Sequence, residues 1–451
     1  MNVFKIDGRW KSNQKLLNLA STHGIEFQLD HRAGESLYRK IKNVKFGENL
    51  PRQLLGKRYD GKKIPFNDLR RQVGHVELIK FFYHLYLSIK NGDLTRISKK
   101  VVELEDELRD FCQGKFAITT DSGSSGLYMA LKAYGVGFGD EVILPPNSFA
   151  ATHNAVMLTG ATPVYADINP YTHLIDPDAV KKALSKHTTA ILPVHMYGQE
   201  VELDELYEIS KHHGIPIVED ACHTIGIDNL YNFPRTRVYS LNPYKNYSVI
   251  TGKGGFVVTD DANVASYISS FREQGFTKQK NFQCQDGFNF RMPPSAVIGS
   301  LLRLRSIGLN NFLRLLIATK YYQCLAPLVE DKKISFLKTE GPHVHHHVTI
   351  LVDPEKRSEI IKKLSQENVE TGIYYDVLMH KQPGLDSFSI KPGVAICLHQ
   401  AELAGQRIIQ LPCSHTLTYF ELKAVIRSLY NVFGLSHKSC PDRKLSDFLT
   451  P

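Results

Sequence analysis

Three stretches of the sequence carry the side chains best suited to chemistry. The first is an apolar run that ends in Glu219 and Asp220, and the second contains Lys245, 25 residues after Asp220 and just before a glycine-rich turn at 251–255. A carboxylate at the end of a parallel strand opens into the crevice where α/β sheets bind ligands. A lysine becomes a nucleophile when desolvation or neighbouring cations lower its pKa. The pair therefore predicts a ligand site that combines a carboxylate with a reactive amine.

The third stretch is the loop DSGSSG at 121–126, which we expect to join a strand to the N-terminus of a helix. Ser124 and Ser125 place hydroxyls beside backbone N–H groups, an arrangement that suits a phosphate. Taken singly, each stretch has a common structural explanation: packing for the aspartate, solvation for the lysine and helix capping for the loop. Together they match the needs of pyridoxal 5'-phosphate (PLP), whose ring nitrogen must stay protonated and whose aldehyde reacts with a lysine.

The elements that must position these residues alternate between short apolar runs and amphipathic stretches. Strands are expected at 116–120, 141–145, 163–168, 189–196, 215–220 and 255–261, and helices at 124–135, 151–160, 177–185 and 204–214. Strands that alternate with helices of this length predict βαβ units and a mostly parallel sheet. A further strand at 343–352 and helices at 354–366 and 422–433 indicate a second, smaller α+β domain.

The chain is expected to be an α/β protein with four segments. These are a basic N-terminal extension (1–63), a large domain with an N-terminal arm (64–310), a small C-terminal domain (311–435) and a flexible tail (436–451). The net charge of +9 comes almost entirely from the extension, which holds fourteen Lys and Arg against six Asp and Glu. A basic segment can attract nucleic acid, but a solvated, lysine-rich surface is the simpler interpretation, so we do not expect a nucleic-acid partner.

The overall composition is that of an ordinary globular protein, with 42% hydrophobic and 22% charged residues among 451. The most apolar long stretch, 312–329, contains Arg314 and Lys320, which argues against a membrane span. The seven cysteines are scattered and form no CxxC pair, which argues against a disulfide framework and a structural zinc site. A soluble protein of the reducing cytoplasm is the simplest expectation.

Residues 64–435 resemble the DegT/DnrJ/StrS family of PLP-dependent sugar aminotransferases, which share the fold of aspartate aminotransferase (fold type I). The motifs that carry the resemblance are IPFNDLRRQ (64–72), DSGSSGLYMAL (121–131), GFGDEVILPPNSFAATHNAV (137–156), PVHMYGQ (193–199), VEDACHTIG (218–226), SLNPYKN (240–246), TGKGG (251–255), GFNFRMP (287–293) and IIQLPCSHTLT (408–418). They occur along the chain in the order that the family has.

The resemblance implies a role for individual residues around the cofactor. Lys245 would bind PLP as a Schiff base and move the proton between substrate and cofactor, while Asp220 would pair with the pyridine nitrogen. His223 would bond the ring hydroxyl or flank the ring, and Phe149 would stack on the pyridine face.

Further residues would hold the phosphate and the substrate. Ser124, Ser125 and Ser240 would bind the phosphate, and Asn289 would reach it from a neighbouring subunit, which implies a homodimer with shared sites. On the substrate side, the resemblance implies roles for Arg291, Tyr374 and His380.

The chain departs from the family pattern at several positions near the expected site. Lys253 replaces an acidic residue of the glycine turn, and Tyr374 stands where a histidine is common. Arg235 and Arg237 lie where a Gly-Asp turn is frequent, and the segment after 291–293 looks one residue short. These departures predict a remodelled substrate pocket around a conventional cofactor site.

The function that the resemblance implies is transfer of an amino group from glutamate or glutamine to a keto-sugar, a nucleotide-linked keto-sugar or a cyclitol, through pyridoxamine phosphate. The product would be an amino sugar or another building block of specialised metabolism. A PLP-dependent dehydratase or cyclase on the same scaffold is one alternative, although such relatives often replace the lysine that is kept at Lys245. A non-catalytic PLP-binding or regulatory protein is the other. The sequence does not identify the acceptor, the position aminated or the purpose of the extension.

Two other groups of residues were weighed for chemistry. His343, His345 and His347 would share one face of a strand, but side chains two apart are too few to define a metal site, so a polar strand face near the domain junction is the simpler interpretation and no metal is expected. Cys222, between Asp220 and His223, could form a Cys–His nucleophile. Packing is the more common reason for a cysteine in that position.

Overall fold

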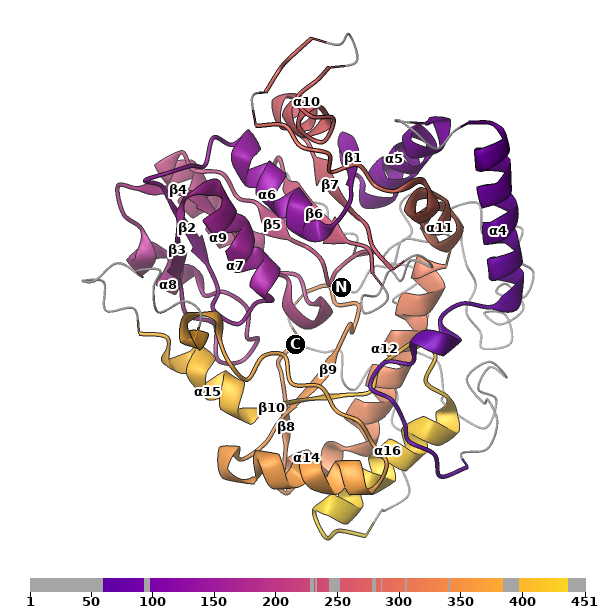
Figure 1. Cartoon of the computed structure of the whole chain (residues 1–451). Helices are drawn as coiled ribbons and strands as arrows, with labels where there is room; N and C mark the ends of the chain where they lie inside the picture. Colours follow the sequence, from indigo (N-terminus) through magenta and orange to yellow (C-terminus); the bar gives the residue numbers. More distant parts are fainter. Residues whose placement is uncertain are drawn as a thin grey trace.

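The computed structural model describes residues 60–92, 98–227, 231, 233–242, 252–277, 281–284, 286–304, 306–339, 341–383 and 397–436 (Figure 1). Three predictions therefore fall wholly or largely outside the described residues. They concern the basic extension up to residue 59, the tail from residue 437 and Lys245.

The large domain is built on a mixed sheet that is parallel over most of its width. Strands β3 (Thr162–Tyr165), β2 (Glu141–Leu144) and β4 (Thr188–Ile191) pair in parallel, and β5 (Glu219–Asp220) pairs in parallel with β6 (Thr236–Ser240). Parallel bridges from Ile191 to Ile217 and from Val194 to Asp220 connect the two groups. At one edge, β7 (Gly255–Thr259) runs antiparallel to β6, and β1 (Phe116–Thr120) pairs antiparallel with β7, so β1 again runs in the direction of β6.

Helices connect and cover these strands, and their ends follow local capping rules. Helix α6 (Gly123–Ala133) begins at Ser122, whose side chain accepts a hydrogen bond from the Ser125 N–H. Helix α9 (Leu203–His213) ends at Gly214 in the left-handed conformation that glycine adopts readily. The remaining helices of this part are α4 (His75–Lys90), α5 (Lys99–Cys112), α7 (Ala150–Thr159), α8 (Pro177–Ala183), α10 (Ala262–Phe271) and α11 (Pro294–Leu304).

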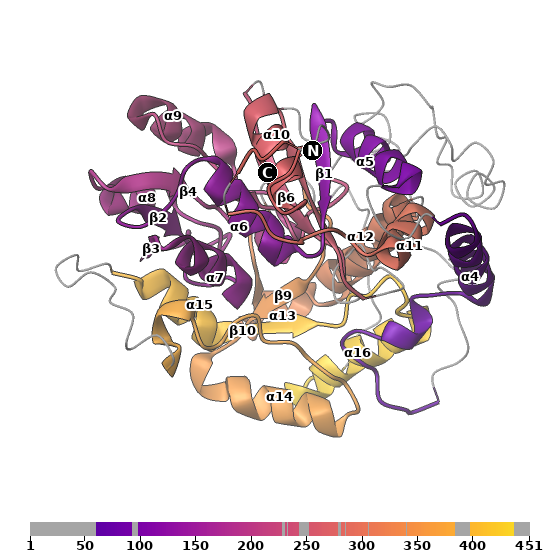
Figure 2. The same ribbon diagram turned by 45° about the horizontal axis from the view of Figure 1, so that its top comes forward.

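The C-terminal part forms a separate layer beneath the large sheet in both views (Figures 1 and 2). Its antiparallel sheet has the order β10–β9–β8, with β8 at Ser335–Phe336, β9 at Val348–Leu351 and β10 at Ile408–Leu411. Helix α16 (Tyr419–Val432) begins with a capping box between Thr418 and Glu421. The other helices are α12 (Ile307–Cys324), α13 (Ala326–Glu330), α14 (Arg357–Gln366) and α15 (His399–Arg407).

Two segments tie the parts of the molecule together. Ile64 is fully buried in the core of the C-terminal part and forms a parallel bridge with Val369. Helix α12 starts in the core of the large domain at Ile307 and continues into the C-terminal core at Ile317. The expected domain boundary after residue 310 falls inside this helix, and the division into domains stays a prediction.

The structure also bears on the expectations about cysteines and membranes. Of the cysteines that the structure describes, five carry free thiols, whereas Cys324 is disulfide-bonded, which the cysteine pattern did not lead us to expect. Across the described ranges, we find no helix with both the length and the apolar character that a membrane span requires.

Two buried histidines predict a stability that falls in mild acid. Burial lowers the pKa of His173 to about 4 and that of His345 to about 3, and neither ring nitrogen of His345 has a hydrogen-bond partner among the described residues. As the pH falls below about 6.5, the unfolded chain takes up a proton at each position while the folded chain does not. The contribution of the two histidines to the free energy of unfolding is therefore fully present above that pH and decreases below it.

We expect His345→Phe to reduce this loss by about 1 kcal/mol between pH 6.5 and 5.5, somewhat less than the roughly 1.4 kcal/mol that a full proton supplies over one pH unit, because the unfolded imidazole is already half protonated at pH 6.5. The measurement is the midpoint of urea unfolding at both pH values. His212→Phe, on the exposed face of α9, is the control and should leave the pH dependence unchanged. An unaltered pH dependence in His345→Phe would contradict the assignment.

Candidate active site

The loop between β1 and α6 forms the cradle that the sequence predicts for a phosphate. Ser124 is exposed and lines a cavity of about 510 Å³, whereas Ser125 is buried and donates its hydroxyl hydrogen bond to the Asp121 carboxylate. A Cβ atom on Gly123 would lie 2.8 Å from the Ser240 Cβ, so only glycine allows β6 to come this close. The structure thus brings Ser124 and Ser240 to one wall and turns Ser125 away from it.

Asp220 lies at the end of β5 and opens into the same cavity. Its Oδ2 accepts a hydrogen bond from the Thr152 hydroxyl at 2.8 Å, and its Oδ1 accepts one from the Cys222 N–H at 3.2 Å. The residue is 6% exposed. Helix α7 and the turn after β5 therefore fix the direction of a nearly buried carboxylate.

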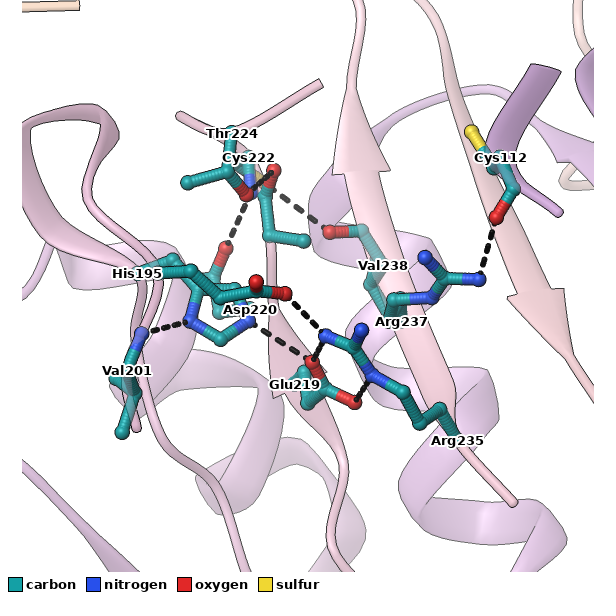
Figure 3. Close-up of polar contacts among 12 residues, drawn as sticks. Cys112, His195, Val201, Glu219, Asp220, Cys222, Thr224, Arg235, Arg237 and Val238 are labelled. Carbon is teal, nitrogen blue, oxygen red and sulfur yellow. Dashed lines mark hydrogen bonds and ion pairs between the residues drawn. The ribbon is translucent and has the colours of Figure 1, made fainter. Parts of the chain in front are cut away.

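Glu219 belongs to a buried ionic network behind the strand (Figure 3). Two nitrogens of the Arg235 guanidinium donate hydrogen bonds to the Glu219 carboxylate, Nε at 2.9 Å and Nη2 at 2.5 Å. Nη2 also donates to Glu200. His195 accepts the Val201 N–H at Nδ1, so its Nε2 carries the hydrogen that it donates to Glu219 at 2.9 Å. Burial alone would raise the pKa of Glu219, but the Arg235 guanidinium outweighs it and holds that pKa well below its usual range.

This network explains the two arginines that depart from the family pattern. Arg235 is balanced by two carboxylates, while Arg237 donates from Nη2 to the Cys112 carbonyl at 2.7 Å (Figure 3). Neither side chain lines the cavity. The two arginines thus stabilise the strands of the large sheet and do not line the cavity.

Aromatic rings form another part of the cavity lining. Phe149, the residue before α7, is 56% exposed and lies 6.3 Å from the Tyr375 ring. Tyr374 and Tyr375 both line the cavity, and the Tyr197 hydroxyl donates to the Tyr374 carbonyl at 2.9 Å. The sequence analysis identified Phe149 and Tyr374 but missed Tyr375, for which adjacency to Tyr374 was the available signal.

The histidine-rich segment does not form the expected strand. Strand β9 begins at Val348, and the positive φ of His345 (48°) interrupts the alternation before it. Consequently His343 and His345 stack on each other in the interior, at 4.2 Å between ring centroids, while His346 and His347 line the cavity. His343 and His345 therefore lie together, but His347 lines the cavity, so the prediction that all three share one face of a strand is wrong.

His346 and His347 complete a cluster of imidazoles with His223. The His223 ring centroid lies 4.5 Å from that of His346 and 5.7 Å from that of His347. His347 also stacks on Tyr374 at 4.8 Å and on Phe66 at 5.5 Å. The N-terminal arm, the C-terminal part and the large domain therefore meet at this wall.

Besides Ser125, three predicted site residues lie away from the cavity of this chain. The exposed Asn289 accepts a hydrogen bond from Arg291 Nε at 2.9 Å, and Arg291 also pairs with Glu273. His380 lies 3.0 Å from Glu402, measured from Nε2 to Oε1. None of the three is among the described residues that line the cavity.

The cavity gathers the predicted cofactor residues from distant parts of the chain. Its lining includes Ser124, Phe149, Asp220, His223 and Ser240. A carboxylate, a helix N-terminus with two serines and an exposed aromatic face fit the ring nitrogen, phosphate and ring face of PLP. The lining also contains residues that the sequence analysis did not assign to a site: Tyr375, His346, His347, Asn242, Cys222 and Lys253.

Comparison with known proteins agrees with this arrangement. A sequence model of the DegT/DnrJ/EryC1/StrS aminotransferase family matches residues 81–430. The chain is 31% identical over 436 residues to the 3-oxo-glucose-6-phosphate:glutamate aminotransferase of Bacillus subtilis (strain 168), covering 95% of this chain and 97% of the relative. It is 33% identical over 321 residues to a pleiotropic regulatory protein of Geobacillus stearothermophilus, covering 69% of this chain and 83% of that protein.

Among solved structures, NtdA from Bacillus subtilis with bound cofactor PMP superposes with a TM-score of 0.79. The sequence identity is 30%, and the match covers 93% of this chain and 97% of NtdA. The expected fold, PLP-dependent transferase fold type I, is confirmed.

The close contact at Gly123 predicts the effect of a single methyl group. We expect Gly123→Ala to weaken PLP binding about ten- to a hundredfold, because overpacking of about 1–3 kcal/mol would displace Ser240 or the helix N-terminus. The measurement is equilibrium dialysis of the apoprotein against PLP. Gly137→Ala is the matched control, since its Cβ would have no neighbour closer than 3.9 Å. Equal PLP affinity in both variants would contradict this description of the cradle.

Proposed function

Because the chain belongs to the DegT/DnrJ/EryC1/StrS aminotransferase family, it is a PLP-dependent aminotransferase, and we propose that it moves an amino group from glutamate to the keto group of a sugar. The observation that carries the proposal is the single cavity lined by Ser124, Asp220 and Ser240. The name of the Bacillus subtilis relative supports glutamate as the donor and a keto-sugar as the acceptor. The product would be an amino sugar for a surface glycan or a specialised metabolite.

The described residues would divide the work of holding the cofactor. Bound PLP supplies an electron sink that stabilises the negative charge left when a proton departs from the carbon bearing nitrogen. Asp220 would keep the pyridine nitrogen protonated, and the hydrogen bonds from Thr152 and Cys222 orient its carboxylate for this. Ser124, Ser240 and the N-terminus of α6 would bind the phosphate, and Phe149 would cover one ring face.

Proton movement is proposed for Lys245, which would also hold the cofactor covalently. Its position in SLNPYKN supports this role, since that segment begins with Ser240, the last residue of β6. His223 would contact the ring, as its place in the cavity lining supports. Ser125, whose hydroxyl is directed to Asp121, would act by securing the loop that carries Ser124.

A homodimer with shared active sites is part of the proposal. Asn289 is exposed beside Phe288, which is 57% exposed, and Phe282 and Phe276 nearby are also exposed. Exposed apolar clusters of this kind mark protein interfaces. In the dimer, Asn289 and Arg291 of one subunit would reach the phosphate and the substrate of the other. A role for His380 near substrate and a cytoplasmic location stay predictions.

A regulatory, non-catalytic protein is the second candidate, because the Geobacillus stearothermophilus relative bears a regulatory name. The two candidates differ in whether amino transfer occurs. Incubation of the PLP-loaded protein with glutamate and a 3-oxo-hexose or its phosphate should yield 2-oxoglutarate and an amino sugar in equal amounts, detected by mass spectrometry. PLP binding without 2-oxoglutarate from any amino donor would favour the regulatory candidate or another PLP reaction.

The role of Asp220 predicts a defined loss of activity. We expect Asp220→Asn to bind PLP yet lower the rate of 2-oxoglutarate formation by about 10²-fold or more, the scale on which one oriented electrostatic partner acts. The control Asp204→Asn changes an exposed carboxylate on α9 and should retain the full rate. A rate in Asp220→Asn within about twofold of the wild type would be incompatible with the proposed partner of the ring nitrogen.

Lys245 gives a spectroscopic prediction that does not depend on the acceptor. Lys245→Ala should lose the visible absorption band of PLP-loaded protein, because no other covalent link is proposed. A Lys253→Ala control should keep the band. Persistence of the same band in Lys245→Ala would assign the covalent role to another residue.

A further inference from the structure

The side chains around the cavity carry an uneven distribution of charge. Among the described residues of the lining, Asp220 supplies the one carboxylate and Lys253 the one ammonium group. The lining also contains three imidazoles, those of His223, His346 and His347. The proposed function already uses Asp220 for the ring nitrogen of the cofactor. Apart from the weakly acidic Cys222, Tyr374 and Tyr375, the remaining ionisable groups of the described lining are cationic or can become so, which suits a ligand with negative charge.

Lys253 stands at the rim of this cavity on a constrained turn. Gly252 has a φ of 81°, and a Cβ atom on Gly254 would come within 3.2 Å of the Met292 side chain. The Lys253 Nζ lies 3.2 Å from Asp121 Oδ2, yet its side chain remains 66% exposed. The ammonium is thus held near the mouth of the cavity while it keeps room for a second partner.

His347 occupies the wall formed by the C-terminal part. Its ring is buried, and it packs on Phe66 and Tyr374 within 5.5 Å between centroids. A Cβ atom on Gly372 would clash with both of those rings, at 2.8 Å from each. The packing of the arm and of the C-terminal part therefore fixes the place of an imidazole that faces the cavity beside His346.

We propose that the acceptor is a sugar that carries a phosphate monoester, and that Lys253 and His347 recognise this phosphate. The proposal rests on the aminotransferase function proposed above and specifies its acceptor. A phosphate monoester carries about −1.5 to −2 charge at neutral pH and offers three strong acceptor oxygens. An ammonium and an imidazole are donors for such a group, and the name of the Bacillus subtilis relative gives a phosphorylated acceptor for that protein.

The cofactor also carries a phosphate monoester, so the two sources must be separated. The N-terminus of α6 with Ser124 and Ser240 already offers a cradle for the cofactor phosphate. Lys253 belongs to a different loop, between β6 and β7, and its side chain is 66% exposed. We therefore assign Lys253 to the phosphate of the acceptor. The PLP affinity of the Lys253 variants tests the alternative, in which Lys253 binds the cofactor phosphate.

The test is calorimetric titration of the PLP-saturated protein with glucose 6-phosphate and with glucose, which lack the keto group and serve as non-reacting probes. Wild-type protein should bind glucose 6-phosphate at least about tenfold more tightly than glucose. Lys253→Ala and His347→Phe should each weaken glucose 6-phosphate binding by about ten- to a hundredfold and leave glucose unaffected. Lys253→Arg should retain most of the preference.

Lys181→Ala is the matched control, because Lys181 is also a partly exposed lysine paired with carboxylates but lies on α8. It should bind both probes as the wild type does. Equal affinity of wild-type protein for the two sugars would overturn the proposal. So would a Lys253→Ala variant that loses affinity for PLP and keeps its preference for glucose 6-phosphate, since Lys253 would then serve the cofactor.

A failure of the proposed aminotransferase reaction would give a different result from a failure of the proposed phosphate subsite. If wild-type protein produces no 2-oxoglutarate from glutamate but retains the Lys253-dependent preference for glucose 6-phosphate, the phosphate subsite stands and the reaction assigned to it falls. If 2-oxoglutarate forms and the preference is absent, the function stands and this subsite is refuted.

Discussion

The arrangement of the site depends on where the Asp220 carboxylate is held. Strand β5 is only two residues long, so its pairing with β6 and the bridge from Val194 must set the position of the backbone. The Thr152 hydroxyl then fixes the side chain from helix α7 at 2.8 Å. A buried carboxylate is costly unless its charge is matched, so a site of this kind favours a ligand that brings a protonated nitrogen. The cavity places aromatic, phosphate-binding and histidine walls around that point.

The opposite side of β5 carries a second set of charges that the fold must balance. Successive strand residues point to opposite faces, so Glu219 enters the interior while Asp220 meets the cavity. Arg235 joins Glu219 to Glu200, and His195 completes the set through its Nε2, 2.9 Å from Glu219. Removing one member of such a buried cluster would leave an uncompensated charge. The network thus supports the strand that carries Asp220, and it gives structural meaning to an arginine that departs from the family pattern.

The sequence predicted the cofactor side of the site better than the substrate side. Ser124 and Asp220 could be located from a loop before a predicted helix and from the end of a predicted strand, whereas Phe149, His223 and Ser240 were assigned from the family resemblance; all five line one cavity. Strand β6 escaped prediction since the charged Arg237 interrupts its short apolar run and Arg235 directly precedes it. The histidine wall escaped it because a single positive φ at His345 redirects the two residues that follow, and local propensity does not foresee a conformation imposed by tertiary packing. Which subunit Asn289 serves depends on a partner chain, which sequence periodicity does not describe.

The central claim is that this cavity holds PLP and accepts an amino group from glutamate onto it. The most direct measurement is the absorption spectrum of PLP-loaded protein before and after glutamate is added. The account predicts a visible band that disappears with glutamate, while 2-oxoglutarate forms in an amount equal to the protein, and that returns when a keto-sugar acceptor is supplied. A band that glutamate and every other amino donor leave unchanged would contradict the account, as would the absence of any bound cofactor.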